Sequence, residues 1–416
     1  MRSLLSIKAN NFLSLGSVNV QLQDLTVLVG PNGSGKSNLL KVIQFLGDMA
    51  RLDLLPAIEA HGGYDKLFFR GKLPGRALPR IRLGITGLVT GNSSENAPDE
   101  YSMSVWQHRI SLKDSTRAIF RRSEYFVFKR TKGRGRRITV SGSKVELAEP
   151  SASGKSSGVV KEVSLAATSS GLSTLPRLKE GGADQINQLA ELFTTFRVFE
   201  IDTVKARNSS RFDPNRPPIL ESDASNLAAF LQWLKLKHDD VFSLLEEDLK
   251  VIVPSVESID FKRLSGASDD GYVIQLVEKG LTGKTDLADA SFGTVRALAL
   301  LAMLHDPHPP RLTCVEEIDH GLHPHALDRI VERMRSASRR TQLLVVTHSP
   351  ALANRLHPHE LVVCERNPQT GGSLIPAIAP EKVAKMAAAS GLLPGELWFS
   401  GALGGVLLEE ANYEGR

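Results

Sequence analysis

Residues 30–37 form a glycine-rich motif whose side chains and spacing suit a phosphate chain. The motif follows an apolar run at 25–29, precedes a helix-like stretch that includes Asn38, and reads Gly30-Pro31-Asn32-Gly33-Ser34-Gly35-Lys36-Ser37. The glycines let successive N–H groups face one concavity, and the helix start adds its positive dipole end. We expect Lys36 to contact the β- and γ-phosphates and the Ser37 hydroxyl to hold Mg²⁺. A chance glycine-rich turn is the alternative, but this order of strand, loop and helix predicts nucleoside triphosphate binding.

Two carboxylates, Glu316 and Glu317, follow a second apolar run at 312–315. Ligands of open α/β sheets bind at the carboxyl ends of the strands. We therefore expect Glu316 to help hold Mg²⁺ through its water shell, and Glu317 to polarise the water that attacks the γ-phosphate. A solvated acidic turn is the alternative. The motif at 30–37 favours catalysis, because phosphoryl transfer needs both a metal site and a group that positions water.

A third strand-like run, residues 342–346, is followed by Thr347-His348-Ser349-Pro350. A neutral imidazole at a strand end can donate a hydrogen bond to a γ-phosphate or accept one from the ordered water. Its position about thirty residues after the two carboxylates predicts that His348 senses the phosphate.

Length and composition indicate a well-packed protein of 416 residues, with 41% hydrophobic residues and a net charge of +5. We expect one large two-lobed unit or two domains. The sequence predicts a cytoplasmic location, because no apolar run reaches the length of a membrane span and no signal-peptide pattern opens the chain. The two cysteines, Cys314 and Cys364, lie in apolar runs and are expected to be buried thiols.

Hydrophobic periodicity predicts an α/β fold. Period-two runs at the N-terminus and between about 80 and 148 indicate strands, the latter forming an antiparallel sheet. Residues 149–175 are rich in Ser, Ala and Gly and are expected to form a mobile loop. Helical patterns cover 184–197, 226–237 and 239–251. From residue 297 onward helices and apolar strands alternate, which favours a parallel sheet.

These motifs resemble those of ABC-class ATPases in the RecF/SMC-like branch, often described as AAA family ATPases, including members of bacterial anti-phage defence modules. A further similarity is Asp289-Ala290-Ser291-Phe292-Gly293-Thr294-Val295-Arg296, which resembles the signature motif of that class. The likeness also covers stretches such as Phe69-Arg70-Gly71. The chain departs from the family pattern at Ile318, where proline is usual, and at Phe292, where aspartate is usual.

The resemblance implies an ABC-type head with a mixed or parallel sheet core, an antiparallel β-subdomain and a helical lobe. We expect the head to span 1–405, with a C-terminal extension at 366–416 that overlaps its weakly matching end. Its parts are expected at 1–75 (phosphate-loop part of the core), 76–200 (β-subdomain with an insertion), 201–285 (helical lobe) and 286–365 (signature, acidic and histidine motifs).

The resemblance also implies that ATP and Mg²⁺ are the cofactors and that the chain forms an ATP-dependent homodimer or a higher oligomer. In the family, the signature motif caps the nucleotide held by a second subunit. Ser291, Gly293 and Thr294 would therefore bind the γ-phosphate in trans, and hydrolysis would let the two heads separate.

Basic and aromatic residues alternate between Arg117 and Arg137. This hairpin could grip nucleic acid, with salt-dependent affinity, or could simply be kept soluble by its cations. The candidate nucleic-acid residues are Arg130, Lys132, Arg134, Arg136 and Arg137.

Two functions are compatible with these patterns. The favoured one is a nucleotide switch that controls an effector protein, such as a nuclease or toxin, in bacterial defence. The alternative is a RecF-like DNA-binding ATPase of recombination and repair. The sequence shows no sustained heptads for a coiled-coil arm and no nuclease motif after residue 350, which favours the regulatory function.

Overall fold

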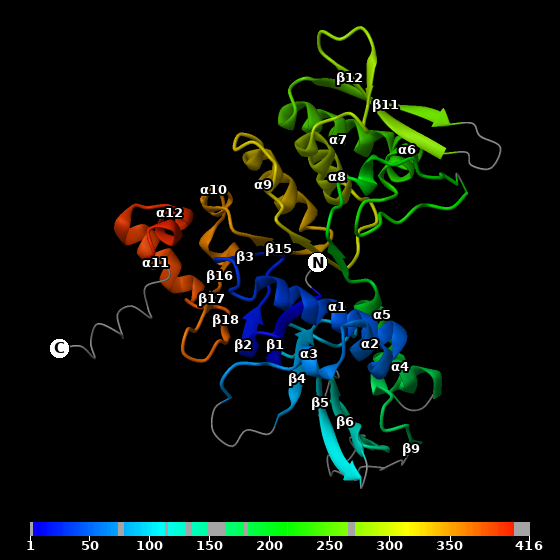
Figure 1. Cartoon of the computed structure of the whole chain (residues 1–416), viewed down its shortest axis with the longest axis vertical. Coiled ribbons are helices and arrows are strands. Elements are labelled where there is room, and N and C mark those ends of the chain that lie inside the picture. The colour runs from blue at the N-terminus through cyan, green and yellow to red at the C-terminus, as the bar shows by residue number, and fades with distance from the viewer. Residues whose placement is uncertain are drawn as a thin grey trace.

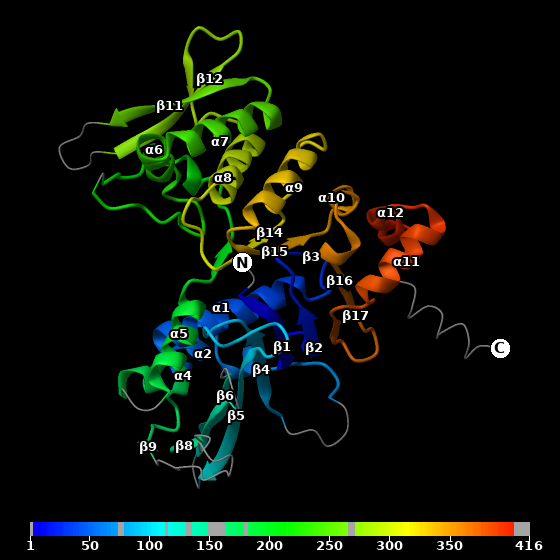
Figure 2. The same ribbon diagram turned by 180° about the vertical axis from the view of Figure 1, so that it is seen from behind.

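The computed structural model describes residues 3–73, 79–112, 115–129, 135–148, 163–178, 182–213, 215–264 and 271–402. Its elements are stacked in layers (Figure 1). An antiparallel sheet lies at one end, followed by helix α1 (Lys36–Leu52), a parallel sheet, and a helical group that carries a small sheet at the other end. Figure 2 shows the same order from behind, with the C-terminal helices α11 (Pro380–Ser390) and α12 (Pro394–Phe399) beside the parallel sheet.

Five parallel strands of the described residues form the central sheet, in the order β10 (Arg197–Phe199), β14 (Leu312–Glu316), β15 (Gln342–Thr347), β3 (Leu25–Val29) and β16 (Leu361–Val363). Both faces are buried. Leu28 and Leu344 pack on the side of α1, whereas Val27 and Val345 pack against the helical group. Burial on both faces is why these strands are continuous apolar runs.

The antiparallel sheet contains eight strands of the described residues, in the order β2 (Leu15–Gln21), β1 (Leu4–Phe12), β4 (Ile81–Gly87), β5 (Asp99–Leu112), β6 (Ser115–Phe128), β7 (Arg136–Ser141), β8 (Lys144–Ala148) and β9 (Val163–Ser164). Its inner face shares one apolar core with α1 and α5 (Ala183–Thr194). The antiparallel sheet expected between 80 and 148 is confirmed, and it also includes the two N-terminal strands.

The helical group is formed by α6 (Leu227–Lys237), α7 (Asp239–Ile252), α8 (Phe292–Leu304) and α9 (Ala326–Ala337). It carries a sheet of β11 (Val256–Leu264), β12 (Gly271–Glu278) and β13 (Lys284–Asp286). The shorter elements are α2 (Leu54–Ala60), α3 (Tyr64–Leu67), α4 (Gly171–Thr174), α10 (Pro350–Ala353), the hairpin β17 (Glu365–Arg366) and β18 (Ser373–Leu374), and 3₁₀ turns at Leu175–Leu178, Lys205–Arg207 and Pro358–Glu360.

The α/β class is confirmed, and several element predictions need correction. The helix expected to reach residue 197 ends at Thr194, and Arg197–Phe199 pairs with β14 as an edge strand. Strands β11–β13 were not expected from the sequence, because their exposed and buried residues do not alternate cleanly. Both cysteines are buried, as predicted. Among the described residues no helix is both long and apolar enough to span a bilayer. The domain boundaries remain a proposal.

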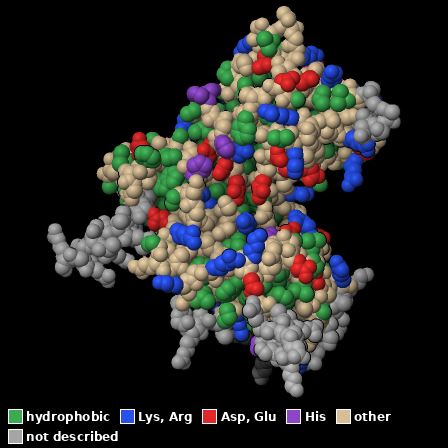
Figure 3. Space-filling view, in the orientation of Figure 1, with side chains coloured by type: hydrophobic (Ala, Val, Ile, Leu, Met, Phe, Trp, Pro, Cys, Tyr) green, Lys and Arg blue, Asp and Glu red, His purple; other side chains and the backbone are tan. Residues whose placement is uncertain are grey.

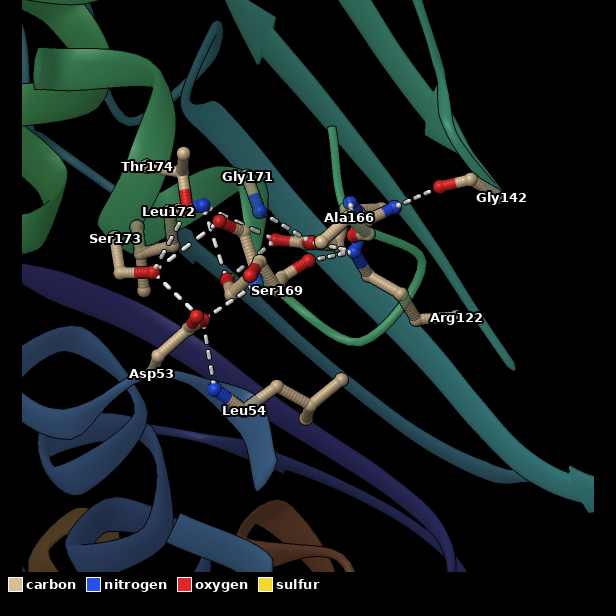
Figure 4. Close-up of polar contacts among 12 residues, drawn as sticks. Asp53, Leu54, Arg122, Gly142, Ala166, Ser169, Gly171, Leu172, Ser173 and Thr174 are labelled. Atoms are coloured by element: carbon tan, nitrogen blue, oxygen red, sulfur yellow. Dashed lines mark hydrogen bonds and ion pairs between the residues drawn. The ribbon is translucent and has the colours of Figure 1, made fainter. Parts of the chain in front are cut away.

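The prediction of a mobile loop at 149–175 is wrong for residues 163–175. Residues 149–162 lie outside the described residues. Residues 165–175 include α4 and pack on the antiparallel sheet through a buried polar network (Figure 4). Glu124 of β6 accepts hydrogen bonds from Gly171 N (2.6 Å) and from Ser170 Oγ (3.0 Å). Asp53, between α1 and α2, accepts from Ser173 Oγ at 2.8 Å. These contacts order a stretch whose composition suggested a mobile loop.

Candidate nucleotide site

The phosphate-loop residues lie between β3 and α1 in a tightly packed turn. Gly33 and Gly35 have φ angles of +78° and +101°, which residues with a Cβ rarely adopt. A Cβ at Gly30 would lie 2.2 Å from the carbonyl oxygen of Cys364. The glycines are therefore required by the backbone path and by the close approach of the strand end after β16.

Lys36 begins α1 with its ammonium folded over the loop. Nζ donates to the carbonyl oxygens of Gly30 (2.7 Å) and Pro31 (2.9 Å), and lies 3.4 Å from Ser34 Oγ. Burial lowers the pKa of Lys36, and the nearby Glu316 and Glu317 oppose this shift. The loop thus holds a cation beside the backbone N–H groups at the start of a helix, an arrangement that attracts phosphate.

The acidic motif lies directly opposite the loop. Ser37 Oγ donates to Glu316 Oε2 at 3.2 Å across the gap between α1 and the end of β14. Burial raises the pKa of the Glu316 carboxyl, and repulsion from Glu200 and Glu317 adds to this effect. Glu200 follows β10, the neighbouring strand, and was not singled out from the sequence because it belongs to no recognised motif.

Glu317 has a strained backbone and polar neighbours on both sides. Its φ of +49° lies in the left-handed region, and its N–H donates to Val346 O at 2.8 Å. One carboxylate oxygen lies 3.0 Å from His320 Nδ1, and the other lies 4.0 Å from His348 Nδ1. The adjacent strands β14 and β15 therefore bring both predicted catalytic side chains together at one sheet edge.

One cavity of about 760 Å³ joins these groups, a size typical of small-molecule sites. Among the residues predicted from the sequence, it is lined by Asn32, Gly33, Gly35, Lys36, Ser37, Asn38, Glu316, Glu317 and His348. Three further cations line it, Lys66, Arg70 and Arg366. Arg70 belongs to a stretch noted above as a family similarity, whereas no sequence signal pointed to Arg366, which comes from the β17–β18 hairpin. Acidic, histidine and basic side chains also gather at the middle of one face of the molecule (Figure 3).

The signature residues Ser291, Gly293 and Thr294 do not line this cavity. Ser291 caps α8, where its Oγ accepts from Thr294 N at 3.1 Å. Ser291 is exposed, and 43% of the neighbouring Phe292 is exposed as well. A Cβ at Gly293 would lie 2.5 Å from Gly321 O, so glycine is needed for this helix start to approach the acidic loop.

The donor set beside the phosphate loop fits Mg²⁺. A hydroxyl and a carboxylate oxygen, Ser37 Oγ and Glu316 Oε2, face each other, and oxygen atoms are the ligands that this ion prefers. These two residues would hold the ion, which would neutralise phosphate charge when bound.

The structure divides the nucleic-acid candidates. Arg130, Lys132 and Arg134 lie outside the described residues. Arg136 turns toward α5, where Nη1 donates to Gln185 Oε1 at 2.8 Å, and only Arg137 is exposed. Arg122, which belongs to the same basic stretch, is completely buried beside Glu124, with Nε and Oε1 3.1 Å apart. The prediction of one exposed basic hairpin is therefore wrong for Arg122 and Arg136.

The layered fold and the cavity between phosphate loop and acidic motif define an ABC-type ATPase head. Two solved structures with this fold are an SMC head bound to the C-terminal winged-helix domain of ScpA (15% identity, TM-score 0.53, covering 92% of this chain and 99% of that one) and an SMC head from Pyrococcus furiosus bound to the C-terminal domain of ScpA (13% identity, TM-score 0.53, covering 94% and 99%).

At these identities the likeness shows the fold alone. Residues 25–354 match the family described as "AAA domain, putative AbiEii toxin, Type IV TA system", and the chain belongs to this family of ATPases. No curated protein matches the chain.

Proposed function

We propose that the chain binds and hydrolyses ATP with Mg²⁺ at the interface of a head-to-head homodimer, and that it acts as a nucleotide switch that controls an effector protein. The observation that carries this proposal is the single cavity that joins Lys36, Ser37, Glu316, Glu317 and His348. In this proposal Lys36 binds the phosphates, and the Glu317 carboxylate orients the attacking water and accepts its proton. His348, 4.0 Å from Glu317, donates a hydrogen bond to the γ-phosphate.

The exposed signature surface supports a site shared between two copies. Ser291 and Phe292 are exposed at the start of α8 and lie outside the cavity of their own chain. An N-terminal helix end that points to solvent can bind an anion held by another molecule. A two-fold dimer would place each such helix start against the phosphate loop of the other copy.

The regulatory part of the proposal rests on the family description and on the free energy that ATP-driven closure can supply. The family description names a toxin and a type IV toxin–antitoxin system, which supports a role in bacterial defence. ATP-driven closure provides differential binding of a few kcal/mol, enough to change the occupancy of a partner about a hundredfold.

Mixed dimers test the shared site. Lys36→Ala and Ser291→Arg chains should each be inactive alone, because one lacks the phosphate contact and the other blocks the capping surface. A mixture should regain ATPase activity, since one of the two nucleotide sites in a mixed dimer pairs an intact phosphate loop with an intact signature motif. A mixture that stays inactive, although both variants fold and associate, would contradict the shared site.

The switch is tested with Glu317→Gln. This change should slow turnover by about 10²-fold or more and leave ATP binding intact, because only the water-polarising group is lost. Size-exclusion chromatography should then show an ATP-dependent dimer. Unchanged turnover would refute the role of Glu317, and a monomer in saturating ATP would refute the switch.

A further inference from the structure

The outer face of the antiparallel sheet is an open surface with a regular arrangement of side chains. Residues that face each other across antiparallel strands project to the same side. The register therefore defines the outer face. Most residues of its rows are exposed or half-buried, whereas the alternate residues, such as Leu83, Met103 and Val140, are buried in the core.

One row across this face carries three serine hydroxyls between an arginine and a lysine side chain. Along it, neighbouring strands contribute Asn10, Arg82, Ser104, Ser123, Ser141 and Lys144. The distance from β4 to β8 is about 19 Å at the usual strand spacing. Small hydroxyl side chains allow close approach of a ligand and donate hydrogen bonds to phosphate oxygens.

The rows on either side supply aromatic rings. Trp106 lies opposite Arg121, and the guanidinium carbon of Arg80 lies 4.2 Å from the centre of the Trp106 ring. On the other side Tyr125 lies opposite Ser102 and Thr139. Among the described residues no second aromatic ring contacts either Trp106 or Tyr125. Both rings are half-buried, so part of each remains accessible from this face.

Positive charge dominates the same face. Among the described residues, its carboxylates are Glu100, which is paired with Lys129 at 3.1 Å, and Glu146. Its cations are Lys8, Arg80, Arg82, Arg121, Arg137 and Lys144. An acidic polymer is therefore favoured over an acidic cofactor, because the charges are spread over the sheet and not gathered in a cavity.

We propose that this outer face binds single-stranded nucleic acid. The arginines and lysines contact the phosphates, while unpaired bases stack on Trp106 and Tyr125. A duplex cannot use these rings, since its bases are already stacked on each other. The proposed surface differs from the basic hairpin suggested by the sequence, because Arg122 and Arg136 point elsewhere and Lys8 and Arg82 come from other strands. It does not depend on ATP chemistry.

The experiment measures fluorescence anisotropy of labelled oligomers of about 15 nucleotides, within the site sizes of β-folds that bind single strands. Deoxythymidine, uridine and duplex oligomers are compared. The double variant Arg82→Glu/Arg121→Glu should weaken single-strand binding about tenfold or more at low salt. It should also reduce the slope of log K against log salt by about 1.4, since each lost contact removes about 0.7.

Trp106→Leu separates stacking from charge. It should lower the affinity about fivefold or more with the salt slope unchanged, because a stacking contact involves no counterion release. The matched control is Lys382→Glu/Lys385→Glu on α11, which makes the same charge change on an exposed helix. Circular dichroism and thermal melting verify that each variant is folded.

Loss of single-strand affinity in both sheet-face variants, for DNA or RNA, supports the proposal. It is overturned if the wild-type protein binds no single strand at low salt, if the α11 control loses as much affinity, or if the duplex binds more tightly than the single strands.

Discussion

The guanidinium of Arg296 donates a hydrogen bond of 2.6 Å to the backbone carbonyl of Glu317, and the same nitrogen lies 3.1 Å from the carbonyl of Glu316. Arg296 belongs to α8, the helix that Ser291 caps. A rigid helix therefore connects the exposed signature residue directly to the acidic motif. In the proposed dimer, a second copy bound at Ser291 would act on the carbonyl of Glu317 through this contact, because Arg296 belongs to the helix that Ser291 caps.

The first prediction concerns this connection. Arg296→Lys should lower kcat about tenfold and leave ATP affinity unchanged, because a flexible ammonium replaces the rigid, planar guanidinium whose Nη2 contacts both carbonyls. Steady-state turnover and equilibrium nucleotide binding measure the two effects. The matched control is Arg340→Lys, since Arg340 donates to the carbonyls of Leu304 (2.8 Å), the last residue of α8, and of Asp306 (3.0 Å) just after it. Equal losses in both variants would contradict a specific connection.

The second prediction concerns Arg366. Its Nε donates to Gly371 O at 3.2 Å within the β17–β18 hairpin, and its side chain lines the nucleotide cavity. Arg366→Gln should weaken ATP binding about tenfold, as expected for the loss of one charge-assisted contact to phosphate. Titration with a fluorescent ATP analogue measures the effect, and Lys385→Gln on α11 serves as the exposed control. Wild-type affinity in Arg366→Gln would exclude the hairpin from nucleotide binding.

The third prediction concerns pH. Because burial raises the pKa of Glu316 in the folded protein, the folded state binds a proton that the unfolded state releases at the ordinary carboxyl pKa. The charged carboxylate therefore lowers stability above its raised pKa when no metal is bound. Glu316→Gln should raise Tm in EDTA at pH 8, and this gain should shrink as the pH falls toward the raised pKa. A gain in Tm that does not change with pH would contradict a raised pKa of Glu316 in the folded protein.

The fourth prediction concerns the network that holds residues 165–175. The Arg122 and Glu124 side chains are fully buried, and Arg122 also donates to the carbonyls of Ser169, Gly142 and Ala166 (Figure 4). Arg122→Met should destabilise the protein by about 3–5 kcal/mol, because it leaves a buried carboxylate without its cation. Urea denaturation measures the change.

A double-mutant cycle completes this test. Arg122→Met/Glu124→Gln should be more stable than the sum of the single changes predicts, since the second substitution removes the unpaired charge. Additive losses would show that the two side chains act independently.

Local patterns in the sequence determined the α/β class, most of the strands and helices, and many of the residues that line the candidate nucleotide cavity. The phosphate loop could be recognised because its glycines and its lysine lie within eight consecutive positions, so their geometry depends on a local turn. The apolar runs at 25–29, 312–315 and 342–346 predicted a parallel sheet, since only strands buried on both faces are continuously apolar.

The tertiary structure alone decided which distant residues meet. Arg366 reaches the cavity because the hairpin after β16 folds back beside the phosphate loop, where a Cβ at Gly35 would clash with Ser373 Oγ. Ser373 Oγ also lies 2.6 Å from Ser14 Oγ in the turn between β1 and β2. Arg122 looked like a surface cation, yet the pairing of β6 places it on the inner face beside Glu124. Composition cannot distinguish these cases, because a strand alternates its side chains between two faces. Pairing and packing determine which face is buried.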